Sequence, residues 1–163
     1  MNFHFTLWNP NGLTQAKWDN LVARLPILPK VAFFTESHHH TNLELPSGYS
    51  QINNPNINWG VTIVHHNDVS ITDVWKDSDG RVITCILHHA GNLTRTFLGY
   101  WPATNDRGER REFNDKHAEA IRGADLILGD SNSTLDWKRD STWTRNHPSP
   151  GLPELLSDTT QWC

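Results

Sequence analysis

The sequence has few cysteines, no long apolar run and no excess of basic residues, and each feature excludes a class of protein. Cys85 and Cys163 are its only cysteines, too few for a disulfide framework, so we expect a reducing, intracellular compartment. No apolar run approaches the ~20 residues that cross a membrane, and residues 1–5 do not begin a signal peptide. We therefore expect no membrane partner. A formal net charge of −4 argues against a dedicated, high-affinity nucleic-acid binder, although an enzyme can handle nucleic acid through a metal.

The length and composition are those of one folded domain. The chain has 163 residues, which suffice for one hydrophobic core and are too few for two ordinary domains. Apolar residues make up 36% and charged residues 20%, and there is no repeat or low-complexity segment, so disorder and coiled coil are excluded. We treat residues 1–163 as a single domain.

The apolar pattern of the first 35 residues predicts a strand–helix–strand unit. Phe3, Phe5 and Leu7 alternate with polar residues, which is typical of a strand. Thr14 is placed to cap a helix, in which residues 18, 21, 22 and 25 form one apolar face. Residues 31–35 are apolar and β-prone, and we expect them to form a second strand parallel to the first.

The rest of the chain predicts a β meander followed by a helix and a strand. Residues 37–58 are polar and rich in Asn, His and Pro, so we expect a long surface loop. The elements expected after it are strands over 60–65, 69–75, 81–89 and 95–100, a helix around 113–121, a strand over 124–129 and a short helix from 152 to 156. This order predicts an α/β protein with mixed sheets. Since an edge of the last sheet lacks a partner, the chain reads as if it stops early.

Polar side chains follow several of these strands at the point where each strand ends. They are Asn9, Asn11, Glu36, Tyr100, Asp130 and Asn132. Polar groups that converge at the carboxyl ends of strands are a common site geometry in α/β folds. Glu36 and Asp130 offer the hard oxygen ligands that Mg²⁺ or Mn²⁺ prefers. Asn9 and Asn132 can orient a phosphate or a water, and Tyr100 can donate a hydrogen bond to a phosphoryl oxygen.

Each of these positions also has an ordinary structural interpretation. Residues 9–12 can be a simple turn, Glu36 a solvated strand end, Tyr100 a packing residue, and Asp130 and Asn132 a loop cap. The consecutive histidines at 38–40 do not predict a zinc site, because neighbours on an extended chain point in opposite directions and no spaced partner set is present. Arg107, Arg110 and Arg111 can contact a nucleic-acid backbone, but the interleaved Glu109 and Glu112 favour a solvated helix start.

Five motifs occur in an order that resembles the endonuclease/exonuclease/phosphatase superfamily around DNase I and exonuclease III. They are Trp8-Asn9-Pro10-Asn11-Gly12-Leu13, Thr35-Glu36-Ser37-His38, Gly60-Val61-Thr62-Ile63-Val64, Gly99-Tyr100-Trp101-Pro102 and Gly129-Asp130-Ser131-Asn132-Ser133. The resemblance implies a four-layer α/β sandwich of two mixed sheets flanked by helices. It also implies Mg²⁺- or Mn²⁺-dependent cleavage of a phosphodiester, with DNA as the partner.

The resemblance also implies a role for each candidate residue. Glu36 binds the metal and Asn9 holds the metal site or the phosphate. Tyr100 contacts the scissile phosphate, Asp130 positions or deprotonates the attacking water, and Asn132 binds a phosphoryl oxygen. Asn11 stands near the metal where nuclease members often carry Asp, which weakens one acidic contribution.

The style of the loops most resembles the endonuclease domain of non-LTR retrotransposons. The expected context is then a larger reverse-transcriptase polyprotein acting in the nucleus. The family closes with further strands and a late Asp-His pair, which this chain does not show: His147 lies in a proline-rich segment. We therefore expect the N-terminal two-thirds of such a domain, lacking its C-terminal strands, as a monomer or a fragment. Three functions follow: a DNA-nicking endonuclease, a phosphatase or phosphodiesterase for lipid or nucleotide phosphates, and a catalytically inactive fragment.

Overall fold

The computed structural model describes residues 4–38, 42–103 and 107–132. These residues divide into two compact units: the first extends to Tyr100 and includes residues 124–130, and the second contains the described residues from 101 to 123 together with 131 and 132. The strands are β1 (Phe5–Trp8), β2 (Val31–Thr35), β3 (Tyr49–Asn54), β4 (Val61–His66), β5 (Ser70–Lys76), β6 (Val82–His89), β7 (Asn92–Tyr100) and β8 (Leu126–Asp130), and the helices are α1 (Gln15–Arg24) and α2 (Arg107–Gly123).

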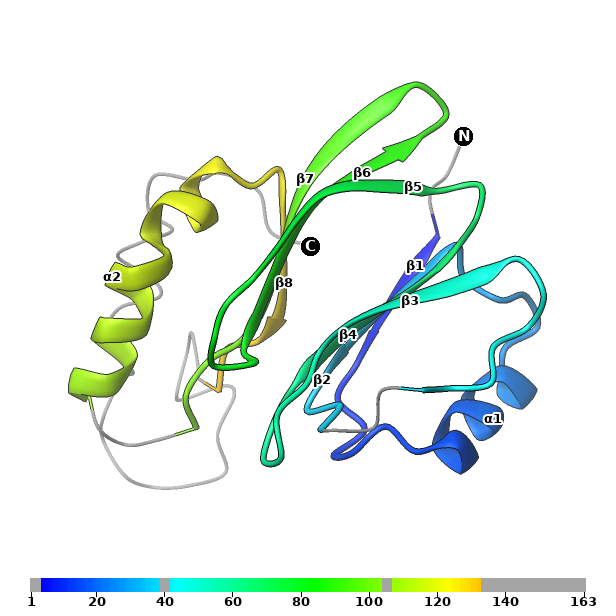
Figure 1. The fold of residues 1–163 in the computed structure, drawn as a ribbon, viewed down its shortest axis with the longest axis horizontal. Helices are drawn as coiled ribbons and strands as arrows, with labels where there is room; N and C mark the ends of the chain where they lie inside the picture. The colour runs from blue at the N-terminus through cyan, green and yellow to red at the C-terminus, as the bar shows by residue number, and fades with distance from the viewer. Residues whose placement is uncertain (1–3, 39–41, 104–106, 133–163) are drawn as a thin grey trace, which may run out of the picture. The chain divides into compact units, whose positions relative to one another are not determined.

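The first unit consists of two four-stranded mixed sheets and α1 (Figure 1). One sheet has the strand order β1-β2-β4-β3, and the other has the order β5-β6-β7-β8. In each sheet one pair is parallel, β1 with β2 and β7 with β8, and the other pairs are antiparallel. This arrangement of mixed sheets confirms the predicted α/β sandwich.

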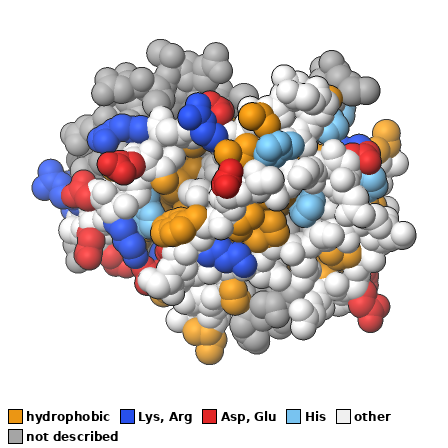
Figure 2. Space-filling model, turned by 45° about the horizontal axis from the view of Figure 1, so that its top comes forward, with side chains coloured by type: hydrophobic (Ala, Val, Ile, Leu, Met, Phe, Trp, Pro, Cys, Tyr) orange, Lys and Arg blue, Asp and Glu red, His pale blue; other side chains and the backbone are white. Residues whose placement is uncertain are grey.

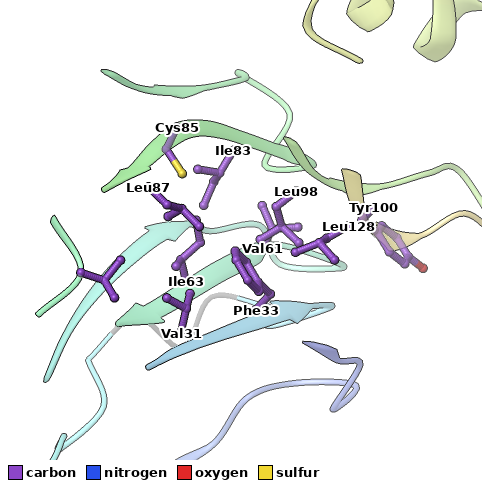
Figure 3. Close-up of a cluster of buried hydrophobic side chains, with 11 residues drawn as sticks. Val31, Phe33, Val61, Ile63, Ile83, Cys85, Leu87, Leu98, Tyr100 and Leu128 are labelled. Atoms are coloured by element: carbon purple, nitrogen blue, oxygen red, sulfur yellow. The ribbon is translucent and has the colours of Figure 1, made fainter. Parts of the chain in front are cut away.

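The core of the first unit lies between its two sheets. Alternation along β2 divides its side chains: Val31 and Phe33 join the cluster between the sheets, whereas Ala32 and Phe34 pack with Trp18 of α1. Figure 3 shows the first cluster, in which Ile83, Cys85 and Leu87 of β6 face residues of β2 and β4. β2 is buried on both faces, which explains why its sequence is apolar throughout.

The predicted N-terminal unit is confirmed, including its helix cap. The hydroxyl of Thr14 accepts a hydrogen bond from the backbone N–H of Lys17 at 3.3 Å, which satisfies a donor in the first turn of α1. The strands β4 to β7, the helix α2 and the last strand also lie close to the predicted residues, although α2 begins six residues earlier, at Arg107. The predicted meander is correct only for β5, β6 and β7, because β4 pairs with β2 and β3 in the other sheet. The helix predicted from residue 152 falls outside the described residues.

The predicted long loop over residues 37–58 is wrong, because it contains β3. This strand pairs with β4 along its whole length, from Tyr49 opposite His66 to Asn54 opposite Val61. Its sequence is polar since it forms the edge of its sheet, and only Ile52 packs against the core between the sheets. No helix among the described residues combines the length and apolarity needed to cross a membrane.

Candidate active site

The turn after β1 is a compact loop that fixes the side chain of Asn9. The Oδ1 atom of Asn9 accepts the backbone N–H of Asn11 at 3.1 Å, which is the local bond of an Asx turn. Asn11 and Gly12 have φ angles of 48° and 86°, a region that Asn and Gly tolerate best. The ammonium of Lys17 donates to the carbonyls of Pro10 at 2.6 Å and Asn11 at 2.7 Å, and so ties the loop to α1.

Glu36 lies in a second turn that is hydrogen-bonded to the first. Its carbonyl accepts the backbone N–H of Gly12 at 2.6 Å, and the carbonyl of Ser37 accepts that of Leu13 at 3.1 Å. Glu36 itself has a φ of 50°, a conformation that costs a residue with a Cβ about 1 kcal/mol. The surrounding hydrogen bonds hold this strained residue at the carboxyl end of β2, beside the Asn9 loop.

Asp130 is the last residue of β8, and a glycine brings its strand close to β7. Gly129 has a φ of 146°, and a Cβ at this position would lie 1.8 Å from the carbonyl oxygen of Gly99. Asp130 continues the face of Leu128, which belongs to the core between the sheets. In the parallel register Asp130 lies opposite Tyr100, so the two side chains share one face of the sheet.

One amide joins the two predicted acidic residues. The Nδ2 atom of Asn9 donates to Oε1 of Glu36 at 2.9 Å and to Oδ2 of Asp130 at 3.0 Å. Because both oxygens contact one nitrogen, they lie less than about 6 Å apart. The bond from Asn11 to Oδ1 fixes which end of the Asn9 amide faces the carboxylates, since an oxygen turned toward them would repel both. Three residues predicted from separate strand ends thus meet at one point.

The other predicted residues are placed differently. Tyr100 is 7% exposed, and Figure 3 shows it at the margin of the core cluster with its hydroxyl directed away from the other side chains. Asn11 contributes its backbone to the Asn9 loop, and the residue is exposed. Asn132 belongs to the second unit, where its Nδ2 donates to the carbonyl of Trp101 at 2.8 Å.

The donor set at Asn9 fits a hard divalent cation that keeps several waters. Glu36 and Asp130 are half-buried, and Mg²⁺ is commonly held by one or two carboxylates, with waters completing its coordination. Within the described ranges, no group of three or more His, Cys, Asp and Glu side chains could hold a metal, so a closed all-protein cage is not formed there. The arrangement suits an open metal site in which a phosphate oxygen could be one of the ligands of the cation.

Two further residues beside Tyr100 were not singled out by the sequence. Arg81 is 9% exposed, and its guanidinium carbon lies 3.8 Å from the ring centroid of Trp59 and 5.5 Å from that of Tyr100. The Asp79-Gly80 turn signal places Arg81 at the start of a strand. No local pattern shows that its side chain is buried in contact with two aromatic rings.

The sequence matches no protein-family model and no curated protein, but the fold is similar to solved structures. The 3′ phosphatase NExo from Neisseria, bound to a product DNA hairpin, superposes with a TM-score of 0.61 and 20% identity over 81% of this chain and 58% of that one. A humanized TDP2 from D. rerio gives 0.59 and 15% over 79% and 62%. The AP endonuclease LMAP from Leishmania major gives 0.55 and 18% over 86% and 59%.

These similarities define the fold of the chain. The similar structures are exonuclease, AP endonuclease and TDP2 enzymes of the superfamily that the sequence motifs resemble. The described sheets therefore have the DNase I-like arrangement that the resemblance implies. The chain spans 58–62% of the length of the three structures compared.

Proposed function

We propose that this chain carries the metal-binding part of a phosphodiester hydrolase that acts on DNA as a nicking endonuclease. The observation that supports this most directly is the contact of one Asn9 amide with both Glu36 and Asp130. Two anionic oxygens so close together repel each other, and a divalent cation relieves that repulsion. The structural neighbours include complexes with a product DNA hairpin and with a single-stranded DNA product.

In this proposal the residues bind the metal, the attacking water and the phosphate, and Asp130 has two roles. Glu36 and Asp130 hold Mg²⁺ or Mn²⁺, and Asn9 keeps the two carboxylates in register. Asp130 orients the attacking water and accepts its proton, while Tyr100 donates a hydrogen bond to a phosphoryl oxygen. Asn11 supports the metal site through the Asn9 loop. Binding of a phosphoryl oxygen by Asn132, which belongs to the second unit, is a separate prediction. The cation, when bound, supplies charge neutralisation at the phosphate.

The charge distribution favours recognition through the metal over recognition by a broad basic surface. On the face shown in Figure 2, acidic and basic side chains are interspersed, and the whole sequence has a formal net charge of −4. A nucleic-acid binder without a metal usually presents a cluster of Lys and Arg. We therefore expect DNA binding by this chain to depend on the divalent cation.

The test is a comparison of isosteric variants in two assays. Glu36→Gln and Asp130→Asn keep acceptors for the Asn9 amide but remove one charge each. We expect both to weaken Mn²⁺ binding, measured by calorimetry, at least tenfold and to abolish Mg²⁺-dependent nicking of a supercoiled plasmid. Asp73→Asn is the matched control, because Asp73 is an exposed carboxylate with a φ of 50° that Asn tolerates. Unchanged Mn²⁺ affinity in both site variants would refute the proposal.

A second candidate is a phosphatase of the same fold, since the similar Neisseria protein is described as a 3′ phosphatase. Release of inorganic phosphate from an oligonucleotide with a 3′ phosphate, without nicking of a closed plasmid, would favour it over the endonuclease. Origin from a non-LTR retrotransposon, with action in the nucleus, is the biological setting we propose for the endonuclease. Sequencing the gene beyond residue 163 tests that setting, because it predicts a continuing frame that encodes an Asp-His motif and a reverse transcriptase.

A further inference from the structure

Arg81 makes three separate contacts with Tyr100. Its carbonyl accepts the backbone N–H of Tyr100 at 2.9 Å, and its Nη1 donates to the carbonyl of Tyr100 at 3.4 Å. Its guanidinium carbon also lies 5.5 Å from the centroid of the Tyr100 ring. The arginine therefore constrains both the backbone and the ring of the residue that is proposed to contact phosphate.

The guanidinium also lies over Trp59, which is itself anchored. The guanidinium carbon is 3.8 Å from the Trp59 ring centroid, and the indole Nε1 donates to the carbonyl of Asp79 at 2.6 Å. The carbonyl of Trp59 accepts the backbone N–H of His38, two residues after Glu36. Arg81 therefore contacts both the ring of Tyr100 and the ring of Trp59, whose backbone is bonded to the segment that follows Glu36.

The hairpin turn that carries Arg81 is fixed by a buried carboxylate. Oδ1 of Asp77 accepts the backbone N–H groups of Arg81 and Val82, each at 2.9 Å. Asn54, on the opposite sheet, donates to the same oxygen at 2.8 Å. These bonds locate the start of β6 relative to β3, so the guanidinium reaches the two rings from a rigid backbone.

A cation at this buried position needs partners that an apolar side chain would not need. Burying a guanidinium is unfavourable unless its partners compensate for the lost hydration, and the Trp59 and Tyr100 rings are two such partners. A Met or Leu of similar volume would fill the same space without that cost. Arg also differs from Lys in that its planar group stacks flat against a ring.

We infer that Arg81 is a positioning residue that holds Tyr100 in the orientation in which its hydroxyl meets a phosphodiester. This inference rests on the proposed function, in which Tyr100 contacts the phosphate. The chemistry it addresses is a phosphate diester in the presence of Mg²⁺, and Arg81 acts on it through Tyr100.

The test uses tyrosines labelled with ¹³C in the ring, because the chain has two tyrosines and Tyr49 is an internal reference. The variants are Arg81→Met and Arg81→Lys, and the control is Arg95→Met, which removes an exposed arginine of the same sheet. Without ligand, we expect Arg81→Met to change the ¹³C chemical shifts of the Tyr100 ring and to average its signals through increased ring motion. We expect Arg95→Met to leave these signals unchanged. On addition of bis(4-nitrophenyl) phosphate and Mg²⁺, affinity should fall about tenfold in Arg81→Met and recover in part in Arg81→Lys.

The two ways in which the idea can fail are distinguishable. Unchanged Tyr100 signals in Arg81→Met, in a chain whose parent binds the probe, would overturn the role of Arg81 alone. A parent chain that does not bind the probe would overturn the proposed function and the phosphate role of Tyr100 with it. If Arg81→Met does not fold, Arg81→Lys carries the test: an intermediate loss of affinity supports the inference, and parental affinity with parental ring signals overturns it.

Discussion

Replacement of Gly129 by alanine should separate β7 from β8 and displace Asp130 at the end of β8. The added Cβ would lie 1.8 Å from the carbonyl oxygen of Gly99, whereas Cβ contacts under 3.0 Å essentially do not occur. The strands must therefore separate by more than about 1 Å, which lengthens their hydrogen bonds beyond the useful range. Loss of two such bonds costs about 2 kcal/mol, and the φ of 146° adds about 1–2 kcal/mol of strain.

We expect Gly129→Ala to lower the free energy of unfolding by about 3–4 kcal/mol, measured by urea denaturation. The matched control is Gly91→Ala, because Gly91 also has a positive φ, of 78°, but a Cβ added there would meet no atom within 4 Å. Strain alone should cost that variant about 1 kcal/mol. Mn²⁺ affinity should fall in Gly129→Ala and stay at the parental level in Gly91→Ala. Equal losses of stability in the two variants would refute the reasoning from close approach.

Three further outcomes follow from the described contacts. Burial raises the pKa of the Cys85 thiol to about 12, so peptide mapping should show Cys85 unmodified by iodoacetamide at pH 8 in the folded chain and modified in urea. Asn54→Ala removes a buried amide that donates to Asp77 and should destabilise the chain by about 1–3 kcal/mol in urea denaturation; a loss below about 0.5 kcal/mol, on the order of an exposed substitution, would contradict this. The backbone N–H of Arg95, and then its guanidinium, lower the pKa of Asp125 below 3.8. Asp125→Asn should therefore cost up to about 1 kcal/mol at pH 7, since the pair is exposed, and the difference should vanish as the pH falls through the lowered pKa. A pH-independent difference would contradict that origin.

Local patterns predicted most of the fold because its strands and helices obey them. β2 is a continuous apolar run bounded by polar residues, and α1 has a capping threonine and an apolar face. β3 was not predicted because an edge strand can be held by backbone pairing alone. Its residues, such as Gln51 and Asn53, are not typical of strands. Its hydrogen bonds to β4, rather than its side chains, define it.

The sequence predicted which residues form the candidate site, but it did not predict how their side chains contact one another. Strand ends indicated Asn9, Glu36 and Asp130, since polar residues after buried strands meet at one edge of a fold. That the Asn9 amide turns its N–H₂ group toward both carboxylates depends on the bond from Asn11, which only the folded loop reveals. The contact of Arg81 with two aromatic rings is likewise a tertiary feature, made by segments far apart in the chain.

The hydrogen bond between Asn9 and Asp130 joins residues 121 positions apart in the sequence. This separation determines the stage of folding at which the site can form. Contacts of such long range form late and slowly in folding, because closing the intervening loop costs entropy before the contact is gained. During synthesis, β1 and β2 emerge long before β8, so Glu36 and Asn9 exist as a pair before their third member is available. We therefore expect metal affinity to mark the completion of folding: it should rise only with the last phase of refolding, when the first and the last strand of the described fold have met.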